Sequence, residues 1–441
     1  MTAMTSERVF GPERTPEEIC RIMLCGPAVR AVQELKRLGV LRDGILRSGT
    51  LAKELKLEAQ ILERFFRVAW KLGLLQRSEG GYELTSMGRE LREREDALCT
   101  GENWDQYTHD ASNLLEDPTS DLDRVLRGPI WSRVLYTAVQ TGLMESIQAS
   151  ADLNDAELLM ARVLEKIGFT KFDDGRFAVT SDGALLLDAD PDSKVGSILL
   201  SGEERWRAYE HIGESLHGRI PFEMIHQKSY FDYLQDHPEL SRIFDRSMAE
   251  ISVLERAWLR PWIARLNAPS FVDVGGGTGQ TLQQVCEVHP DMEVTLFDLD
   301  AEGQHLPLLE GRCSFKNGSF FEPATIPATD GVYMLKRVLH DWDDAEVEQI
   351  LRNIASRMHS NASIWIVEPI LIDDDALSLS DLTDIYLLPL MNGKERSVDA
   401  YRILVESAGL KVADFEALGG HLSALRLIPQ SGSMDIPSTR R

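Results

Sequence analysis

One histidine and two glutamates far along the chain are the residues whose types suit proton transfer. In the stretch GVYMLKRVLHDWDDAEV, residues 331–347, an apolar strand leads through two basic residues to His340. Ligands of open α/β sheets bind at the carboxyl ends of strands, which is where this imidazole would emerge. Glu368 ends a later apolar strand, SIWIVE, and Glu395 lies in the run MNGKERS. A lone histidine more often starts a helix or packs in a core, so the two carboxylates within reach are what favour chemistry.

The run FVDVGGGTGQ at 271–280 predicts a loop that binds a nucleotide-like ligand. Three alternating glycines follow the strand: Gly275, Gly277 and Gly279. Glycine lets the backbone turn tightly and approach a ligand without a Cβ in the way. A dinucleotide site needs G-x-G-x-x-G, but Gln280 takes the last position, and the order is D-x-G-x-G-x-G from Asp273. The alternative is a glycine-rich connector without a ligand.

A carboxylate follows at the end of the next apolar run. MEVTLFDL, residues 292–299, contains Asp298, which lies 19 residues after Gly279. In doubly wound folds an acid about 20 residues past the glycines binds ribose hydroxyls. We expect this role for Asp298, against the alternative of a solvated acid in a turn that also holds Asp300 and Glu302.

The elements that must position these residues alternate from residue 269 onward. Strand patterns FVDV, EVTLFDL, CSFKNGSF, GVYMLKRV and SIWIVEP alternate with helical ones, and LKVADFEAL and LSALRLI close the series. This alternation predicts an α/β fold with a parallel sheet covered on both faces. We expect this Rossmann-like domain over 267–428, a helical connection at 237–266 before it and a flexible tail at 429–441.

The N-terminal half contains a weak internal repeat. Residues 28–92 and 134–187 both show an apolar helix, a strand, a GG or DG turn, a second strand, and LT or VT followed by a glycine. Helices followed by a small hairpin indicate a winged helix, so this mostly helical region would be duplicated. We expect an extra first copy in 1–96, a connector in 97–130, and a shortened second copy with a helical region in 131–266.

The charge distribution argues against a nucleic-acid partner. The 441 residues, 43% hydrophobic, carry 47 Lys and Arg against 71 Asp and Glu, a net charge of −24 that repels phosphates. Residues 20–95 are mildly basic, with 15 Lys and Arg against 10 Asp and Glu. Arg64, Arg67 and Lys71 share a helix face there, and we expect that face to be solvated.

Other classes of site and location are not indicated. No apolar run approaches the roughly 20 residues of a membrane helix, and the N-terminus lacks a signal peptide, so we expect a cytoplasmic protein without a membrane partner. Five cysteines stand far apart without C-x-x-C, and we expect reduced, packing residues: Cys20, Cys25, Cys99, Cys286 and Cys313. We find no acid and histidine cluster with metal-ligand spacing, so we expect no metal.

The motifs DVGGGTG, FDL, LKRVLHDWDD, the strand end VEP and NGKERS together resemble the class I S-adenosylmethionine-dependent small-molecule O-methyltransferases that act on plant phenolics, acetylserotonin and bacterial polyketides. The resemblance covers about residues 131–428, including YFDYLQDHPELSRIFDRSM at 230–248 and a winged-helix dimerisation domain similar to the second copy. It implies a class I methyltransferase fold, a homodimer through the winged-helix region, and a hydroxylated aromatic acceptor in secondary metabolite biosynthesis. S-adenosylmethionine would be the methyl donor and S-adenosylhomocysteine the product.

The resemblance also implies residue roles. His340 would be the general base, with Glu368 and Glu395 beside its ring. Cofactor contacts are implied at Asp273, Gly275, Gly277, Gly279, Asp298, Ser319, Phe320 and Lys336, and substrate contacts at Asp341, Trp342, Met391 and Asn392. A phenol has a pKa of about 10 and a free imidazole about 6.5, so the base needs a carboxylate on its far nitrogen.

Two departures from the family pattern keep alternatives open. Ser319 stands where the family has the Asp of G-D-x-F, which binds the adenine amine, and Asn392 replaces the first glycine before K-E-R. A non-methylating reaction, a hydroxylation or a cyclisation that uses only the sulfonium charge, is therefore the first alternative. A tandem winged-helix regulator that senses a ligand is the second.

Overall fold

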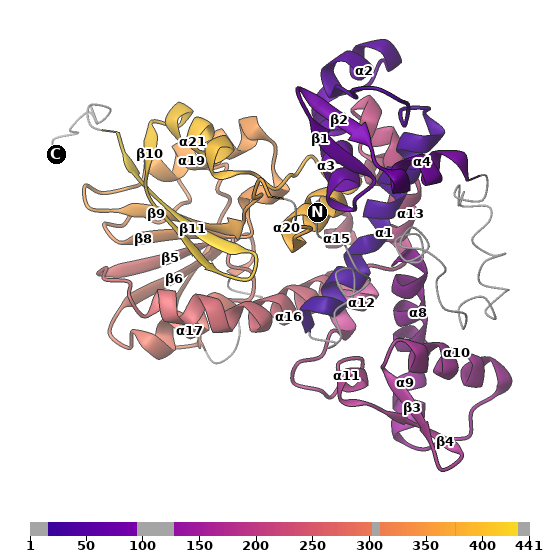
Figure 1. The fold of residues 1–441 in the computed structure, drawn as a ribbon. Helices are drawn as coiled ribbons and strands as arrows, with labels where there is room; N and C mark the ends of the chain where they lie inside the picture. Colours follow the sequence, from indigo (N-terminus) through magenta and orange to yellow (C-terminus); the bar gives the residue numbers. More distant parts are fainter. Residues whose placement is uncertain (1–15, 95–127, 302–308, 375, 431–441) are drawn as a thin grey trace, which may run out of the picture. The chain divides into compact units, whose positions relative to one another are not determined.

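A computed structural model describes residues 16–94, 128–301, 309–374 and 376–430 (Figure 1). The chain divides into two compact units, residues 1–250 with 374–391 and residues 251–373 with 392–441. The division falls inside one long helix, α16 (Pro238–Ile263). The segment 374–391, which the sequence placed in the C-terminal domain, belongs to the first unit.

The first unit contains two copies of the arrangement that the repeat predicts, helices followed by a two-stranded antiparallel hairpin. The first copy comprises α1 (Pro16–Arg37), α2 (Ser48–Leu55), α3 (Ala59–Lys71), β1 (Leu75–Ser78), β2 (Gly81–Leu84) and α4 (Ser86–Glu93). The second comprises α8 (Gly128–Gln140), α9 (Leu143–Gln148), α10 (Asp155–Lys166), β3 (Thr170–Asp173), β4 (Arg176–Val179) and α11 (Ser181–Ala184). Positive φ angles at Asp174 and Gly175, 46° and 81°, form the predicted hairpin turn.

Both copies close at the same threonine and glycine corner. The Thr85 hydroxyl accepts from the Gly88 amide at 3.1 Å, and the Thr180 hydroxyl accepts from the Gly183 amide at 3.0 Å. A Cβ at Gly88 would lie 2.1 Å from a backbone oxygen, and one at Gly183 would lie 2.0 Å from the equivalent oxygen. The LT and VT signatures of the repeat therefore mark one shared structural feature.

The basic face of α3 is not solvated, so that expectation is wrong. It packs against α20 (Leu379–Leu387), whose apolar residues Leu382 and Ile385 share a core with Phe65 and Phe66. Two ion pairs join the two helices, Arg64 with Asp384 (3.0 Å) and Arg67 with Asp381 (2.7 Å), and Lys71 pairs with Asp374 (2.9 Å), which precedes α20. Lys71 has no exposed side-chain surface. This face is therefore used for packing within the unit.

The remaining elements of the first unit are short helices: α12 (Val195–Leu200), α13 (Glu203–Glu210), η4 (Ile212–His217), α14 (Pro221–His226) and α15 (Tyr230–Asp236). They enclose an aromatic core that includes Tyr209, Phe222, Tyr230 and Tyr386.

The second unit is built on a seven-stranded sheet in the order β10-β11-β9-β8-β5-β6-β7. Its strands are β5 (Ser270–Val274), β6 (Glu293–Asp298), β7 (Ser314–Asn317), β8 (Val332–Lys336), β9 (Ser363–Pro369), β10 (Leu410–Gly419) and β11 (Leu422–Pro429). β5 to β9 pair in parallel, as predicted, but β10 and β11 form an antiparallel hairpin at one edge. The turn between those two strands is too short for a parallel crossover.

The order of the strands creates a switch point beside β5. The chain leaves β5 toward β6 and β7 on one side and returns to β8 on the other. Ligands of such sheets bind at the carboxyl ends of the strands at this point. The glycine loop follows β5 and His340 follows β8, so the fold brings the two predicted features to one edge.

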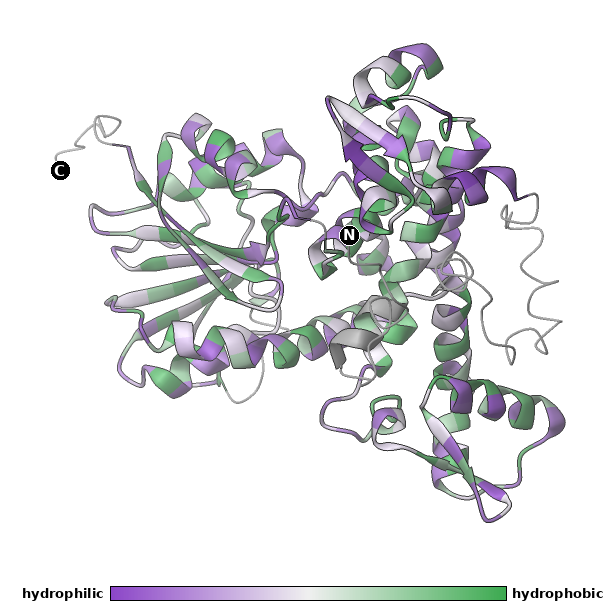
Figure 2. Ribbon diagram, viewed as in Figure 1, coloured by the Kyte–Doolittle hydropathy of each residue, from purple (hydrophilic) through white to green (hydrophobic). Residues whose placement is uncertain are grey.

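Apolar side chains fill both faces of the sheet. α19 (Asp344–Ala355) and α21 (Val398–Ser407) cover one face, and α17 (Gln280–Val288) with the end of α16 covers the other (Figure 1). The central strands are largely hydrophobic, as expected for strands buried on both sides (Figure 2). No helix in the described part of the chain is long and apolar enough to cross a membrane.

Two predicted boundaries are shifted. α8 begins at Gly128, inside the expected connector, while residues 97–127 lie outside the described part. Pro429 ends β11 and the Gln430 amide donates to the Gly409 carbonyl at 3.1 Å, so neither residue belongs to the tail, and 431–441 lie outside the described part. No disulfide joins the described cysteines, Cys20, Cys25, Cys286 and Cys313, and the sulfurs of Cys286 and Cys313 lie 3.4 Å apart. Cys99 lies outside the described part.

Candidate active site

The loop after β5 adopts backbone conformations that favour glycine. The φ angles of Gly275, Gly277 and Gly279 are 69°, 55° and 88°. A Cβ at Gly276 would lie 2.7 Å from an oxygen of Asp273. The loop therefore passes directly over the Asp273 carboxylate, and the predicted tight turn is present.

Asp273 offers a buried carboxylate oxygen to a ligand. The residue is 2% exposed, and its Oδ2 has no hydrogen-bond partner in the described part of the chain. Burial raises the pKa of Asp273 to about 7, with Lys336 opposing the rise and Asp298 adding to it. An unpaired buried carboxylate is costly unless a cation reaches it. The ammonium group of S-adenosylmethionine is such a cation, so this site fits the expected cofactor.

Asp298 ties the glycine loop to the end of β6. Its Oδ2 accepts from the Gly277 amide at 2.9 Å, and its Oδ1 accepts from the Leu299 amide at 2.7 Å. Each oxygen retains a lone pair for a ribose hydroxyl. The arrangement fits the role expected for Asp298.

Ser319 and Phe320 occupy the loop after β7. The Ser319 hydroxyl accepts from the Phe321 amide at 3.2 Å, so it offers at most a neutral acceptor in place of the family carboxylate. The rings of Phe320 and Phe321 meet Trp342 edge to face, with centroids 5.6 Å and 4.8 Å away. Trp342, an expected substrate contact, thus packs directly on Phe320, an expected cofactor contact.

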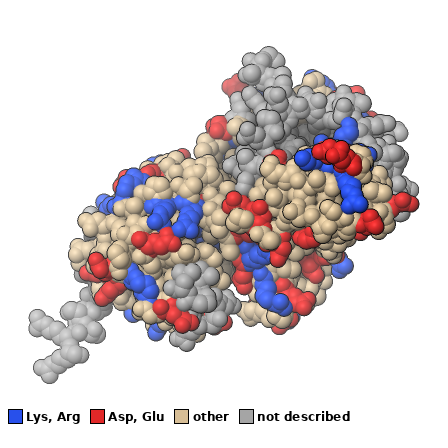
Figure 3. Space-filling model, turned by 90° about the horizontal axis from the view of Figure 1, so that it is seen from below, with Lys and Arg blue, Asp and Glu red and all other residues tan. Residues whose placement is uncertain are grey.

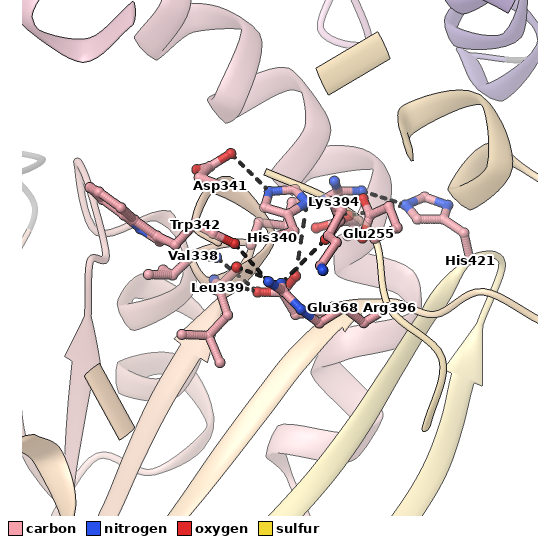
Figure 4. Close-up of polar contacts among 12 residues, drawn as sticks. Glu255, Val338, Leu339, His340, Asp341, Trp342, Glu368, Lys394, Arg396 and His421 are labelled. Carbon is pink, nitrogen blue, oxygen red and sulfur yellow. Dashed lines mark hydrogen bonds and ion pairs between the residues drawn. The ribbon is translucent and has the colours of Figure 1, made fainter. Parts of the chain in front are cut away.

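The predicted base and its two acids come together after β8. His340 lies in the short helix η6 (Leu339–Asp341), beside Asp341 and Glu368 (Figure 4). Its Nδ1 is 2.9 Å from an oxygen of Glu395. A Glu368 oxygen lies 3.8 Å from the same nitrogen, and an Asp341 oxygen lies 3.6 Å from Nε2. His340, Glu368 and Glu395 are all buried.

The two glutamates have different contacts. Glu395 hydrogen-bonds the ring, whereas Oε1 of Glu368 accepts the backbone amides of Val338 at 3.0 Å and Leu339 at 2.8 Å. Glu368 therefore fixes the segment that leads to His340, and Glu395 fixes the imidazole itself.

The carboxylates change the basicity of His340. Burial by itself would lower the pKa of His340, but Glu395, Asp341 and Glu368 overcome that effect and raise it to about 10. This value is close to the pKa of a phenol, about 10, so proton transfer between the two groups is nearly balanced. Because Glu395 binds Nδ1, Nε2 is the nitrogen that can face an acceptor.

Sequence reasoning missed two residues that shape this site. A Cβ at Gly393 would lie 2.3 Å from the His340 carbonyl oxygen, so only glycine fits this approach. Arg396 donates to the carbonyls of Leu339 at 2.9 Å and Trp342 at 2.7 Å. Both residues flank Glu395 in the NGKERS run, which was the available signal.

Three residues expected to contact the cofactor or the substrate lie outside the group formed by His340 and its two glutamates: Lys336, Met391 and Asn392. Lys336 binds Glu255, with 2.8 Å between Nζ and the carboxylate. Met391 packs against the aromatic core of the first unit, whereas Asn392 belongs to the second unit.

The structure also brings together a group with metal-ligand spacing, which we did not expect. Among the described residues, His340, Glu368 and Glu395 each place one possible ligand atom within 4.8 Å of the other two. The three residues come from separate elements, so their spacing in the sequence did not reveal it. The same donors suit a proton relay, because Nδ1 is already hydrogen-bonded to Glu395.

Comparison with known proteins gives the family. The O-methyltransferase domain matches residues 207–411. The mitomycin biosynthesis 6-O-methyltransferase of Streptomyces lavendulae is 31% identical over 312 residues, which cover 65% of this chain and 88% of that protein. The phenazine O-methyltransferase of Lysobacter antibioticus is 28% identical and covers 66% of this chain and 90% of its own.

A solved structure agrees with this similarity. An O-methyltransferase from neocarzinostatin biosynthesis, in complex with S-adenosylmethionine and 2-hydroxy-5-methyl naphthoic acid, is 25% identical, with a TM-score of 0.58 over 68% of this chain and 96% of that chain. The Rossmann-like fold, the glycine loop with its buried acid and the matched relatives lead to one assignment. The chain belongs to the O-methyltransferase family, whose methyl donor is S-adenosylmethionine.

Proposed function

We propose that this enzyme methylates a hydroxyl group of an aromatic small molecule in natural-product biosynthesis, with His340 as the general base. The observation that carries the proposal is the buried hydrogen bond of 2.9 Å between His340 Nδ1 and Glu395. The relatives support the substrate class, since one was crystallised with a hydroxylated naphthoic acid.

The residues divide the work as follows. Asp273 would hold the cofactor's ammonium group and Asp298 its ribose, with Gly275, Gly277 and Gly279 allowing the close approach. Bound S-adenosylmethionine supplies an electrophilic methyl group on its sulfonium. Other cofactor contacts are proposed at Ser319, Phe320 and Lys336, and substrate contacts at Asp341, Trp342, Met391 and Asn392.

His340 Nε2 accepts the hydroxyl proton as the acceptor oxygen becomes nucleophilic. With a free imidazole this transfer from a phenol would cost about 5 kcal/mol, at about 1.36 kcal/mol per pKa unit. The raised pKa of His340 removes most of that cost for the neutral imidazole, because Glu395 stabilises the imidazolium that forms. The neutral form becomes more abundant as the pH rises toward about 10. Positioning the oxygen in line with the methyl group provides the rest of the acceleration.

Incubation with methyl-deuterated S-adenosylmethionine and a panel of hydroxylated aromatics tests the proposal. The panel includes 2-hydroxy-5-methyl naphthoic acid, and mass spectrometry follows each product. We expect a product that carries the deuterated methyl group on oxygen, together with S-adenosylhomocysteine. A converted acceptor without the label would instead identify a non-methylating reaction and reject the proposal.

We further propose a cytoplasmic homodimer that joins through the second winged helix. α1 and α8 pack against each other within one chain, so a partner needs another surface. Leu158, Leu159 and Phe172 offer one, since each is between 40% and 42% exposed. Light scattering that gives the mass of a single chain would reject the dimer.

We propose no nucleic-acid partner. The helix face that a winged helix would present to DNA is paired with acids of the same unit, as Arg67 is with Asp381. The face in Figure 3 carries acidic and basic side chains in small mixed groups. A salt-sensitive gel shift with the full chain would overturn this proposal.

A further inference from the structure

The first residue after β8 has an unusual backbone conformation. Arg337 has a φ angle of 54°, which L side chains rarely adopt, and it lies three residues before His340. Its amide donates to the Val367 carbonyl of β9 at 3.1 Å, so the chain bends immediately after its last contact with the sheet. Strained conformations of this kind persist only where the surroundings fix them.

Glu255 of α16 provides such surroundings. Its carboxylate is fully buried and binds Arg337 Nε at 2.7 Å and Lys336 Nζ at 2.8 Å. His421 lies 3.3 Å from the same carboxylate and 2.6 Å from the Arg337 guanidinium. One acid thus holds the last residue of β8 and the strained residue that follows it.

The cluster is itself held in place from the same helix. Trp258, one turn after Glu255, meets His421 edge to face at 5.6 Å. A Cβ at Gly419 or Gly420 would lie within 2.6 Å of the Trp258 ring, so the turn that carries His421 packs closely on α16. Glu255 therefore acts from a fixed position.

We propose that Glu255 is a positioning residue for the general base: by holding Arg337 in the left-handed conformation, it directs the following segment so that His340 meets Glu395. This inference rests on the proposed role of His340. Glu255 bonds to Lys336, Arg337 and His421, so its effect on His340 passes through Arg337 and the backbone that follows it.

The test measures the ionisation of His340 by NMR of ¹³C-labelled histidine in the full chain, with His340→Gln to identify the signal. The groups that face this ring are Glu395, Glu368 and Asp341, with the Arg337 guanidinium nearby. Glu255→Asp keeps the charge but shortens the reach. We expect it to lower the pKa of His340 by at least about one unit, toward the free value.

Glu255→Asp is also made in an Arg337→Gly background, to distinguish an effect on the backbone at Arg337 from a direct effect of the Glu255 charge on the pKa of His340. Glycine adopts positive φ without help, so Glu255→Asp should then shift the pKa of His340 by less than about 0.3 units. An equal shift in both backgrounds, or no shift in either, would overturn the proposal. Glu287→Asp is the matched control, because Glu287 pairs with Arg256 of α16 at the surface and should change nothing.

A second pair of variants keeps the test informative if Glu255→Asp does not fold. Arg337→Ala and Arg337→Gly both remove the guanidinium, but only alanine retains the backbone strain. We expect a lower His340 pKa in the alanine variant, and equal values would contradict the proposal. Because the titration needs neither acceptor nor cofactor, its outcome is independent of whether methyl transfer is found.

Discussion

The second unit contains two buried clusters of acids and bases that differ in charge balance. Around His340, one imidazole faces the carboxylates of Glu395, Glu368 and Asp341. Around Glu255, one carboxylate faces two cations, Lys336 and Arg337. The first cluster sets three carboxylates against one imidazole, whose pKa is raised to about 10, whereas the second sets two cations against one carboxylate.

The difference in charge gives the two clusters different roles: the one around His340 can exchange a proton, and the one around Glu255 stabilises the structure. Burial would raise the pKa of Glu255, but the charges of Arg337 and Lys336 hold it well below its usual range. Glu255 is therefore ionised at neutral pH. The pKa of His340 is raised to about 10, where phenols also ionise, so this cluster can exchange a proton with an acceptor.

Replacing the base should have the largest effect. His340→Gln removes the proton acceptor but keeps the size and polarity of the side chain, so we expect a loss of about 10²–10⁴-fold in turnover with unchanged affinity for S-adenosylmethionine. Steady-state rates and calorimetry measure the two quantities. The exposed His359→Gln is the matched control and should retain full activity. A similar loss in both variants would contradict the assignment of His340.

Replacing Glu395 and replacing Glu368 should reduce turnover by different amounts, because the two residues have different contacts. Glu395→Gln weakens the partner of the imidazolium, and we expect a loss of about 10–10²-fold in turnover. Glu368→Gln can still accept the amides of Val338 and Leu339, so its loss should be smaller. Turnover and thermal unfolding of the pair provide the comparison. A larger loss of turnover for Glu368→Gln would reverse the roles that the distances assign.

The cofactor site contains Asp273, a buried acid with one oxygen that lacks a hydrogen-bond partner in the described part of the chain. Asp273→Asn should weaken S-adenosylmethionine binding about 10-fold or more, since a charged hydrogen bond contributes about 1.5–3 kcal/mol. Because the pKa of Asp273 is raised to about 7, the carboxylate forms as pH rises through that value. The affinity of the wild-type protein for S-adenosylmethionine should therefore increase as the pH rises from one unit below to one unit above the pKa of Asp273. Calorimetry that finds the same increase in Asp273→Asn would exclude this residue.

Metal removal should have the smallest effect. His340, Glu368 and Glu395 have the spacing of a metal site, but in our account they bind a proton. Turnover after dialysis against a chelator should equal that of untreated enzyme. Activity that falls with the chelator and returns with one added divalent cation would show that the cluster binds that cation instead.

The features that could be predicted from the sequence lie close together along it. The glycine loop, Asp298 and His340 each stand at the end of an apolar strand, and parallel strands bring such ends to one edge. Glu255 could not be found in this way, because it lies 82 residues from Arg337 in a helix with no motif. The basic face of α3 was misread for a similar reason, since Asp381 lies 314 residues from Arg67.

If His340 removes the proton of the acceptor, the loss of turnover in His340→Gln must depend on pH. Turnover of wild type and His340→Gln is measured from neutral pH to above the pKa of the acceptor identified in the labelling experiment, at saturating cofactor. Because the pKa of His340 is raised to about 10, wild-type turnover should rise with pH toward that value as the imidazole loses its proton. A phenolate needs no base, so the defect of His340→Gln should shrink toward unity once the pH passes the pKa of the acceptor. A defect that stays constant across this range would contradict the account, because His340 would then contribute something other than proton removal.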